Sequence, residues 1–587
     1  MKIRLRHLDQ TAAIQTEQQQ FLMSRTANRD ISIWLTISGA QAPGTPVVYR
    51  DVLAWKGLIT ARQQGLRQAL KDDPLFANFR GMIRQLSTVS LSPPLPPSDP
   101  TAIESWKARE SELRRNWESR KIMLEAEHEL LEKELAVHSV AFRETLEERR
   151  VQPEDLAATL KAQDRPTALI DILEYHYFGR TDKGEKNERR IAAFVVYGDQ
   201  PVVRVELGSA EEISRQVTLW RESIGQNVAD QDSGEELRKL VWLPLELHLE
   251  GIETILISPD GPLAQLAWGA LPGEQPNSYL LEDRALVVIP VPQMLPSLLR
   301  EGRRTGPPES LLLAGDIEYG GDPGQPSDLL AKRDAAGRPG DGGLTQFAKL
   351  SAAQGELASI RDWYENADGT GTVKVLRKEN ATESAFREQA SQHQWLHVIT
   401  HGFFAPESVH SAMQSTEDDV ALLHQSDPHR PVRGENPGLL SGLAFAGANT
   451  PPGPEKDDGI LTSLEVAALD LNQVDTVVLS ACETGLGAVA GGEGLRGLQS
   501  AFQVAGAKTC VASLWKVPDA ATARLMQRFY ENLWDRQLGK LEALREAQLW
   551  MMKDQSARGA EIVNESPENT RLPPLYWAAF VLSGDWR

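Results

Sequence analysis

Short apolar runs alternate with amphipathic segments over the second half of the chain. Turn-forming residues bound each run, and the segments between the runs repeat apolar residues at helical spacing. This alternation predicts an α/β fold with a parallel or mixed sheet flanked by helices. The expected strands are residues 254–258, 286–290, 311–314, 372–376, 395–400, 476–480, 508–513 and 577–582.

The region before these strands has a different pattern. Residues 168–178, 190–197 and 201–207 are apolar runs split by Gly, Asp and Lys turns, which predicts an antiparallel meander. Two helical patterns, at 211–224 and 235–249, connect the meander to the alternating region.

The first 160 residues are charged and helical in pattern. A stripe at helical spacing predicts one long helix over 104–149, and a second helix is expected at 52–70. A Pro/Ser-rich break separates the two, so we expect a helical hairpin or small bundle. The predicted parts are a helical region at 1–160, a strand-rich part at 165–305 and the main α/β part at 306–587.

Composition and charge limit the classes of partner that we expect for this protein. The 587 residues carry 62 basic and 82 acidic side chains, a net charge of -20, so we expect neither nucleic acid nor a membrane surface as a partner. Only two cysteines occur, too few for a disulfide framework, which fits a reducing compartment. No signal-peptide core and no long apolar run are present in the sequence. We therefore expect a cytoplasmic protein.

Two predicted strands end in reactive side chains. His401 follows the strand at 395–400, and Cys482 follows the strand at 476–480. In an open α/β sheet, sites form outside the carboxyl ends of the strands, so neighbouring strands bring an imidazole and a thiol together. A thiolate needs such help at neutral pH, and His401 is the expected base for a Cys482 nucleophile.

Glycines surround both residues. Gly402 follows the histidine directly, and further glycines follow the cysteine, which lets a substrate backbone approach closely. The backbone N–H groups of Gly402 and Cys482 are the candidate oxyanion hole. We expect Cys510 and His397, which lie inside strands, to be packing residues, and we predict no metal site and no cofactor.

These residues lie in segments that resemble the CHAT family, the caspase-like domain that is often fused to TPR repeats in bacteria, and more distantly separases and caspases. The segments are Pro259-Asp260-Gly261-Pro262-Leu263, 395–402, Leu479-Ser480-Ala481-Cys482-Glu483-Thr484-Gly485, 492–495, 501–507, Ser513-Leu514-Trp515-Lys516-Val517 and 577–580.

The resemblance implies a caspase-hemoglobinase fold with a strand-rich pseudo-caspase-like subdomain, in the C-terminal part of a TPR-CHAT type protein. It also implies a clan CD cysteine endopeptidase with a His401/Cys482 dyad that cleaves protein substrates. Ser480 stands where caspases have Gln, and the glycine after the cysteine comes one residue later, which favours the CHAT branch.

Analogy with related peptidases also suggests a substrate pocket. Asp316 follows a predicted strand where a carboxylate would pair an Arg or Lys of the substrate, although it also fits a solvated loop acid. Asp519 is expected to line the same cleft, and Trp515 fits either the cleft or the core.

The resemblance further implies regulation by a protein partner, docked on the N-terminal helices, in a bacterial defence or cell-death pathway. The charged helix at 104–149 fits such docking, and it also fits a simple cover for the sheet. Two other functions remain open: a catalytically silent interaction scaffold, and a cysteine-dependent acyl transferase or amidase on the same fold.

Overall fold

The fold is described from a computed structural model. The described residues are 16–39, 45–92, 94, 100–138, 151–181, 184–225, 231–300, 302, 306–320, 347–367, 371–404, 436–449, 457–481, 484–485, 487–490, 494–553 and 571–587. None of the helices in these ranges has the length and apolar character needed to cross a bilayer.

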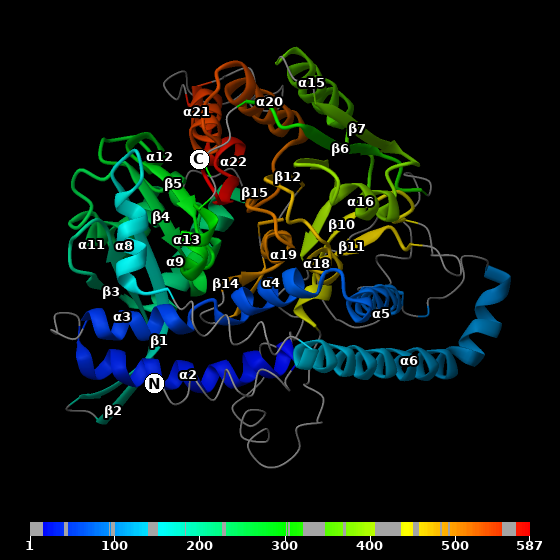
Figure 1. Ribbon diagram of the computed structural model, residues 1–587, viewed down its shortest axis with the longest axis horizontal. Helices are drawn as coiled ribbons and strands as arrows, with labels where there is room; N and C mark the ends of the chain where they lie inside the picture. The colour runs from blue at the N-terminus through cyan, green and yellow to red at the C-terminus, as the bar shows by residue number, and fades with distance from the viewer. Residues whose placement is uncertain are drawn as a thin grey trace.

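An 11-stranded mixed sheet runs through the molecule in the order β3-β2-β1-β4-β5-β16-β15-β12-β8-β6-β7 (Figure 1). Its first half contains β1 (Thr167–Thr181), β2 (Gly184–Val196), β3 (Val203–Ser209), β4 (Thr254–Ser258) and β5 (Ala285–Val288). Its second half contains β6 (Ser310–Ile317), β7 (Thr372–Lys378), β8 (Trp395–Ile399), β12 (Thr476–Ser480), β15 (Thr509–Ser513) and β16 (Phe580–Gly584).

Strand direction follows the predicted patterns. β1, β2 and β3 form the antiparallel meander, and β6, β7, β8, β12 and β15 are parallel neighbours. β16 is antiparallel to β15 and parallel to β5, so the last strand of the chain joins the two halves. The predicted α/β mixed sheet flanked by helices is confirmed, although the predicted strand at 577–582 begins three residues later because Trp577 ends a short helix.

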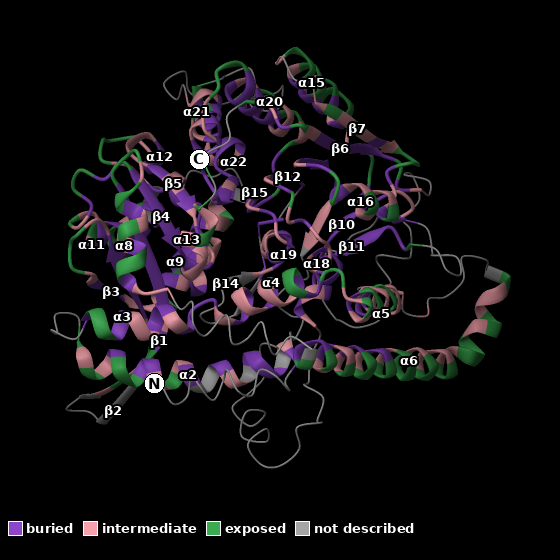
Figure 2. Cartoon of the chain, viewed as in Figure 1, coloured by how far each residue is buried: buried purple, intermediate pink, exposed green. Residues whose placement is uncertain are grey.

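Helices cover both faces of the sheet. They are α8 (Pro153–Lys161), α9 (Ala210–Gly225), α10 (Gln231–Leu237), α11 (Leu243–Glu246), α12 (Leu280–Asp283), α13 (Leu295–Leu298), α15 (Ala353–Asn366), α16 (Glu383–Ala390), α18 (Ser463–Ala467), α19 (Leu498–Val504), α20 (Asp519–Tyr530), α21 (Lys540–Lys553) and α22 (Pro574–Trp577). The sheet strands between them are largely buried (Figure 2). One continuous core cluster runs from the N-terminal helices to Trp586.

Two small sheets lie beside the main one. β9 (Gly402–Phe404), β10 (Ser441–Ala444) and β11 (Ile460–Thr462) form an antiparallel sheet, and β13 (Ala488–Ala490) pairs with β14 (Gly494–Arg496). The first of these begins one residue after His401, and the second follows the segment that contains Cys482. Both small sheets are therefore connected to the predicted dyad.

The N-terminal helices are α2 (Glu17–Ser38), α3 (Thr45–Trp55), α4 (Leu58–Leu70), α5 (Pro74–Leu91) and α6 (Ile103–His138). The single helix expected at 52–70 was wrong, because Gly57 with φ +72° separates α3 from α4. A Cβ at Gly57 would lie 2.6 Å from Cγ1 of Val291, so this break also lets the chain approach the segment after β5 closely. The long helix is confirmed as α6, whose outer face is exposed in Figure 2.

Candidate functional site

The site begins where β8 and β12 end. The two strands are parallel neighbours, with Ser480 opposite Ile399, and the Thr400 N–H donates to the Ser480 carbonyl at 3.4 Å. After Ile399 the chain continues with Thr400 and His401. After Ser480 it continues with Ala481 and Cys482. His401 is described by the structure, whereas Cys482 lies outside the described residues.

The imidazole of His401 is half-buried and packs against two aromatic rings that also contact each other. The ring centroids of Tyr319 and Phe347 lie 5.3 and 5.5 Å from that of His401. His401 Nε2 lies 2.6 Å from the carbonyl oxygen of Ala348. Because a carbonyl only accepts hydrogen bonds, Nε2 carries the proton of the neutral ring, and Nδ1 keeps the lone pair of a base.

The main chain around His401 is held by the small β9–β10–β11 sheet. The Ala444 N–H donates to the His401 carbonyl at 2.9 Å, and Leu443 lies opposite Gly402. In an antiparallel ladder this bond makes Gly402 and Leu443 a non-hydrogen-bonded pair, so the Gly402 N–H points away from β10. That N–H group is therefore not used by this ladder.

The aromatic cover over His401 is fixed by side chains that the sequence did not identify. Asn449 accepts from the Phe347 N–H and donates to the Phe347 carbonyl, both at 3.0 Å. The Tyr319 and Thr400 hydroxyls lie 2.9 Å apart, and Thr400 also donates to the Ala444 carbonyl. No periodicity or motif marks Asn449, Phe347 or Tyr319, because their partners are distant in sequence.

Electrostatics favour the neutral form of His401. Burial lowers the pKa of His401 below its ordinary value, and Lys516 adds to this effect. The hydrogen bond to Ala348 and the negative charge of Asp519 act in the opposite direction. A neutral imidazole at physiological pH is the form that a general base requires.

On the β12 side, two hydroxyls hold the carbonyl that directly precedes Cys482. Ser513 Oγ and Thr484 Oγ1 donate to the Ala481 carbonyl oxygen at 2.7 and 3.0 Å. The Gly485 N–H donates to the Ser513 carbonyl at 2.7 Å, and a Cβ at Gly485 would lie 3.0 Å from that oxygen. The glycine after the cysteine is thus explained by close packing of this turn against the end of β15.

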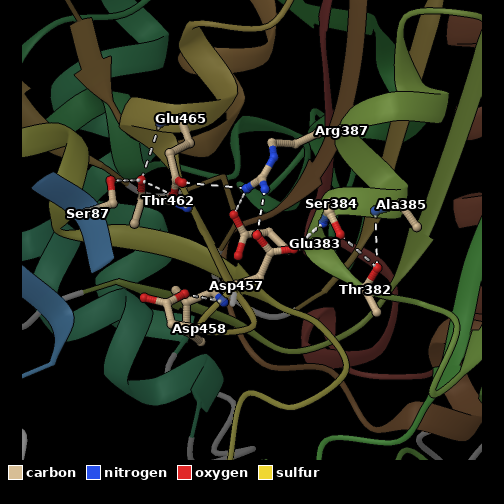
Figure 3. Close-up of polar contacts among 11 residues, drawn as sticks. Ser87, Thr382, Glu383, Ser384, Ala385, Arg387, Asp457, Asp458, Thr462 and Glu465 are labelled. Carbon is tan, nitrogen blue, oxygen red and sulfur yellow. Dashed lines mark hydrogen bonds and ion pairs between the residues drawn. The ribbon is translucent and has the colours of Figure 1, made fainter. Parts of the chain in front are cut away.

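The β9–β10–β11 sheet is in turn tied down by an ionic cluster in which Glu383 and Glu465 are buried (Figure 3). Arg387 of α16 bonds Asp457 at 2.7 Å and also contacts Glu383. Glu465 accepts from the Thr462 hydroxyl at 2.8 Å, and that hydroxyl lies 3.1 Å from the Ser87 hydroxyl of α5. The cluster links α16, β11 and α18 to the N-terminal helices.

A small cavity of about 30 Å³ opens between the ends of β8, β12 and β15. Thr400, Ala481, Ser513 and Asp519 are among its lining residues. Asp519 begins α20 and is half-buried. A carboxylate therefore faces the same corner of the sheet as His401.

The other two expected pocket residues lie elsewhere. Asp316 is a buried residue of β6 with φ +50°, and it already pairs with Arg377 at 2.7 Å and Lys349 at 3.2 Å. Burial alone raises the pKa of Asp316, but these two hydrogen bonds outweigh burial and hold it below its usual value. Asp316 is thus neither the solvated loop acid nor a carboxylate without a partner.

Trp515 belongs to the core. Its Nε1 donates to the Leu575 carbonyl at 3.1 Å, and its ring meets Trp220 edge to face. It is not among the residues that line the small cavity, so the core alternative describes its position.

Two residues predicted to be packing residues are confirmed as such. His397 is fully buried in β8, between the Tyr530 hydroxyl and the Glu356 carboxylate, each 2.9 Å away. Cys510 is fully buried in β15, and burial raises the pKa of its thiol. Neither has the exposure that a reacting group needs.

Comparison with known proteins identifies the family to which the chain belongs. The model of the CHAT domain matches residues 231–585, more than half of the chain, while no curated protein matches it. Among solved structures, the separase of the Saccharomyces cerevisiae separase-securin complex is 9% identical, with a TM-score of 0.40, over 96% of this chain and 40% of that chain. The Arg-specific cysteine proteinase gingipain R is 10% identical, with a TM-score of 0.34, over 62% of this chain and 69% of that chain. By the extent of the family match, this chain belongs to the CHAT domain family.

Proposed function

We propose that the chain is a cysteine endopeptidase that cleaves protein substrates with Cys482 as nucleophile and His401 as base. One observation carries the proposal. Every residue of β8 pairs with the residue 81 positions later in β12, from Trp395 and Thr476 to Ile399 and Ser480. His401 and Cys482 are separated by the same 81 positions, so they follow the two strands in the same register.

The proposed reaction uses the side chains and backbone N–H groups that follow β8 and β12. His401 Nδ1 takes the thiol proton, and the Cys482 sulfur attacks the substrate carbonyl. The N–H groups of Gly402 and Cys482 stabilise the oxyanion, and His401 returns the proton to the leaving amine as the C–N bond breaks. Water, deprotonated by His401, then hydrolyses the thioester and releases the second product and the free thiol.

We further propose that Asp519, rather than Asp316, meets the substrate side chain before the cut. Asp519 lines the cavity beside Thr400 and Ala481, whereas Asp316 already has two cationic partners. A half-buried carboxylate there favours an Arg or Lys side chain.

Regulation by a protein partner through the N-terminal helices, in a bacterial defence or cell-death pathway in the cytoplasm, is part of the proposal. α6 exposes Ile122, Leu130 and Val137 by 64%, 59% and 51%. Its buried side packs with α5 against Leu439 and Leu464, which adjoin the small sheet after His401. A partner on α6 would therefore act on elements connected to the base.

The test is cleavage of a diverse peptide library, read by mass spectrometry. We expect cuts by the wild type and by Cys510→Ala but none by Cys482→Ala, with Arg or Lys before each cut. Asp519→Asn should remove that preference, whereas Asp362→Asn, an exposed acid on α15, should keep it. Apolar residues before the cuts would refute the role of Asp519. No cysteine-dependent cut, with or without candidate partners, would favour the scaffold function.

A further inference from the structure

A second, larger cavity shares no lining residue with the small cavity at the ends of β8, β12 and β15. It has a volume of about 390 Å³ and lies where α2 and α6 meet end to end beneath α18 and α19 (Figure 1). Its walls come from the N-terminal helices on one side and from α18, α19 and the end of β14 on the other. This volume is typical of sites for small molecules.

Two buried nitrogen atoms in its wall lack partners. Arg67 of α4 and His128 of α6 line the cavity and are only 8% and 7% exposed. Arg67 Nε and His128 Nε2 have no hydrogen-bond partner among the described residues. Burying a polar or charged group without a partner is costly, so a wall of this kind is suited to a ligand that supplies the missing acceptors.

Two of the acidic side chains that line the cavity, Glu17 and Glu132, already have partners. Glu17 pairs with Arg496 of β14, and Arg496 also donates to the Thr60 hydroxyl at 3.1 Å. Glu132 accepts from the Glu17 N–H at 2.7 Å, and burial raises the pKa of Glu132 to about 8. Burial thus disfavours the charged form of Glu132, the carboxylate that acts on Arg67.

The remaining acids lie on one side of the cavity. Glu125 and Glu129 line it from α6, and burial raises the pKa of Glu129. The other lining residues include the apolar side chains Phe21, Leu464 and Val504. A ligand in this cavity thus meets Arg67 and His128 as well as hydrocarbon.

We propose that this cavity binds a small organic anion with an apolar body, whose carboxylate or phosphate lies at Arg67 and His128 and whose body lies against Phe21 and Leu464. Such a ligand would touch both the N-terminal helices and the elements around Arg496, and would tie them together. This binding site is separate from the proposed peptidase site and does not depend on it.

The test uses the full chain and two matched pairs of probes, phenyl phosphate with phenol and octanoate with octanol, measured by isothermal titration calorimetry. We expect at least one anion of the two pairs to bind, and to bind at least tenfold more tightly than its neutral counterpart, because charge-assisted bonds to arginine are strong (about tenfold per 1.4 kcal/mol). The anion that binds identifies the ligand as a carboxylate or a phosphate. Inorganic phosphate should bind more weakly than phenyl phosphate, because it lacks the apolar body.

Variants locate the site. Arg67→Gln should weaken binding about tenfold, whereas Arg84→Gln, which removes an exposed arginine on α5, should leave it unchanged. Ala467→Phe fills the cavity from a half-buried position on α18, keeps Arg67 and should also abolish binding. The proposal is overturned if folded wild-type protein binds neither anion, or if Arg67→Gln and Ala467→Phe bind as the wild type does. It is also overturned if phenyl phosphate binds and inorganic phosphate binds equally tightly.

Discussion

A hydrogen bond fixes the tautomer of His401, and neighbouring charges of opposite sign shift its pKa in opposite directions. Its Nε2–H is used by the Ala348 carbonyl, and its pKa is lowered by burial, raised by Asp519 and lowered by Lys516. The base therefore keeps its lone pair to lower pH than an exposed histidine does. This property belongs to the folded chain, because Ala348 and Asp519 are distant from His401 in sequence.

Two substitutions should move the His401 pKa in opposite directions. Asp519→Asn removes a negative neighbour that favours the imidazolium, so the pKa should fall. Lys516→Gln removes a positive neighbour, so the pKa should rise. Since the base must be neutral, the acid limb of any His401-dependent rate should shift with it. An NMR titration of the His401 ring checks both signs, with Asp362→Asn as control, and shifts of the same sign in both variants would contradict the assignment.

Sequence reasoning identified His401 but only some of its neighbours. Position at a strand end and flanking glycines are local signals, and they indicated His401, Gly402 and Cys482. Ser513 and Thr484 lie in segments that resemble the family, but their hydrogen bonds to the Ala481 carbonyl could not be read from those segments. The Asn449 amide carries no local signal, because asparagine is common in any turn. Asp316 was indicated by analogy, and its pairing with Arg377 on the neighbouring strand could not be read from one segment.

Among the elements, the break between α3 and α4 has a cause that the sequence pattern does not show. Lys56, next to Gly57, is fully buried and pairs with Asp171 of β1 at 2.6 Å, and it also donates to the Ser258 hydroxyl at 2.8 Å. The Tyr49 hydroxyl donates to the same carboxylate at 3.1 Å. These bonds attach the N-terminal helices to the carboxyl end of β4 and to the part of β1 that pairs with it.

Removing one member of that pair should destabilise the protein strongly. Lys56→Met leaves Asp171 buried without its cation, and we expect a loss of about 3–5 kcal/mol in the free energy of unfolding. The matched control is Lys161→Met, which breaks the exposed pair with Asp199 and should cost less than about 1 kcal/mol. Urea unfolding followed by tryptophan fluorescence measures both.

Asp171→Asn in the Lys56→Met background provides a second check. It removes the unpaired buried charge, so it should recover part of the lost stability. Equal stability of Lys56→Met and Lys161→Met would mean that the buried pair does not attach the helices to the sheet.

Element types were largely predictable from local pattern. The strands were predicted because short apolar runs between turns have few alternatives, and α6 because its stripe is long. The prediction of a single helix at 52–70 was wrong, because the sequence pattern around Lys56 and Gly57 does not indicate a buried ion pair. The predicted end of the long helix at 149 lies outside the described residues.

At the scale of the whole molecule, the strand order was the information missing from the sequence. The strands at 165–305 and those at 306–587 were expected in separate parts, yet β16 lies between β15 and β5 and joins them in one sheet. Only this order makes β8 and β12 neighbours, and only their shared register brings His401 and the carbonyl of Ala481 to one edge. The division of the chain into parts at 1–160, 165–305 and 306–587 stays a prediction.

The reactivity of the Cys482 thiol tests the central claim most directly, because it does not require a known substrate or an activating partner. The rate of alkylation by iodoacetamide would be followed at each cysteine by mass spectrometry between pH 5 and pH 9, in the wild type and in His401→Ala. The account predicts that Cys482 reacts much faster than buried Cys510, and that His401→Ala slows Cys482 near neutral pH towards the rate of an ordinary thiol with a pKa of about 8.5. Identical pH profiles for Cys482 in the two proteins would contradict a His401/Cys482 dyad.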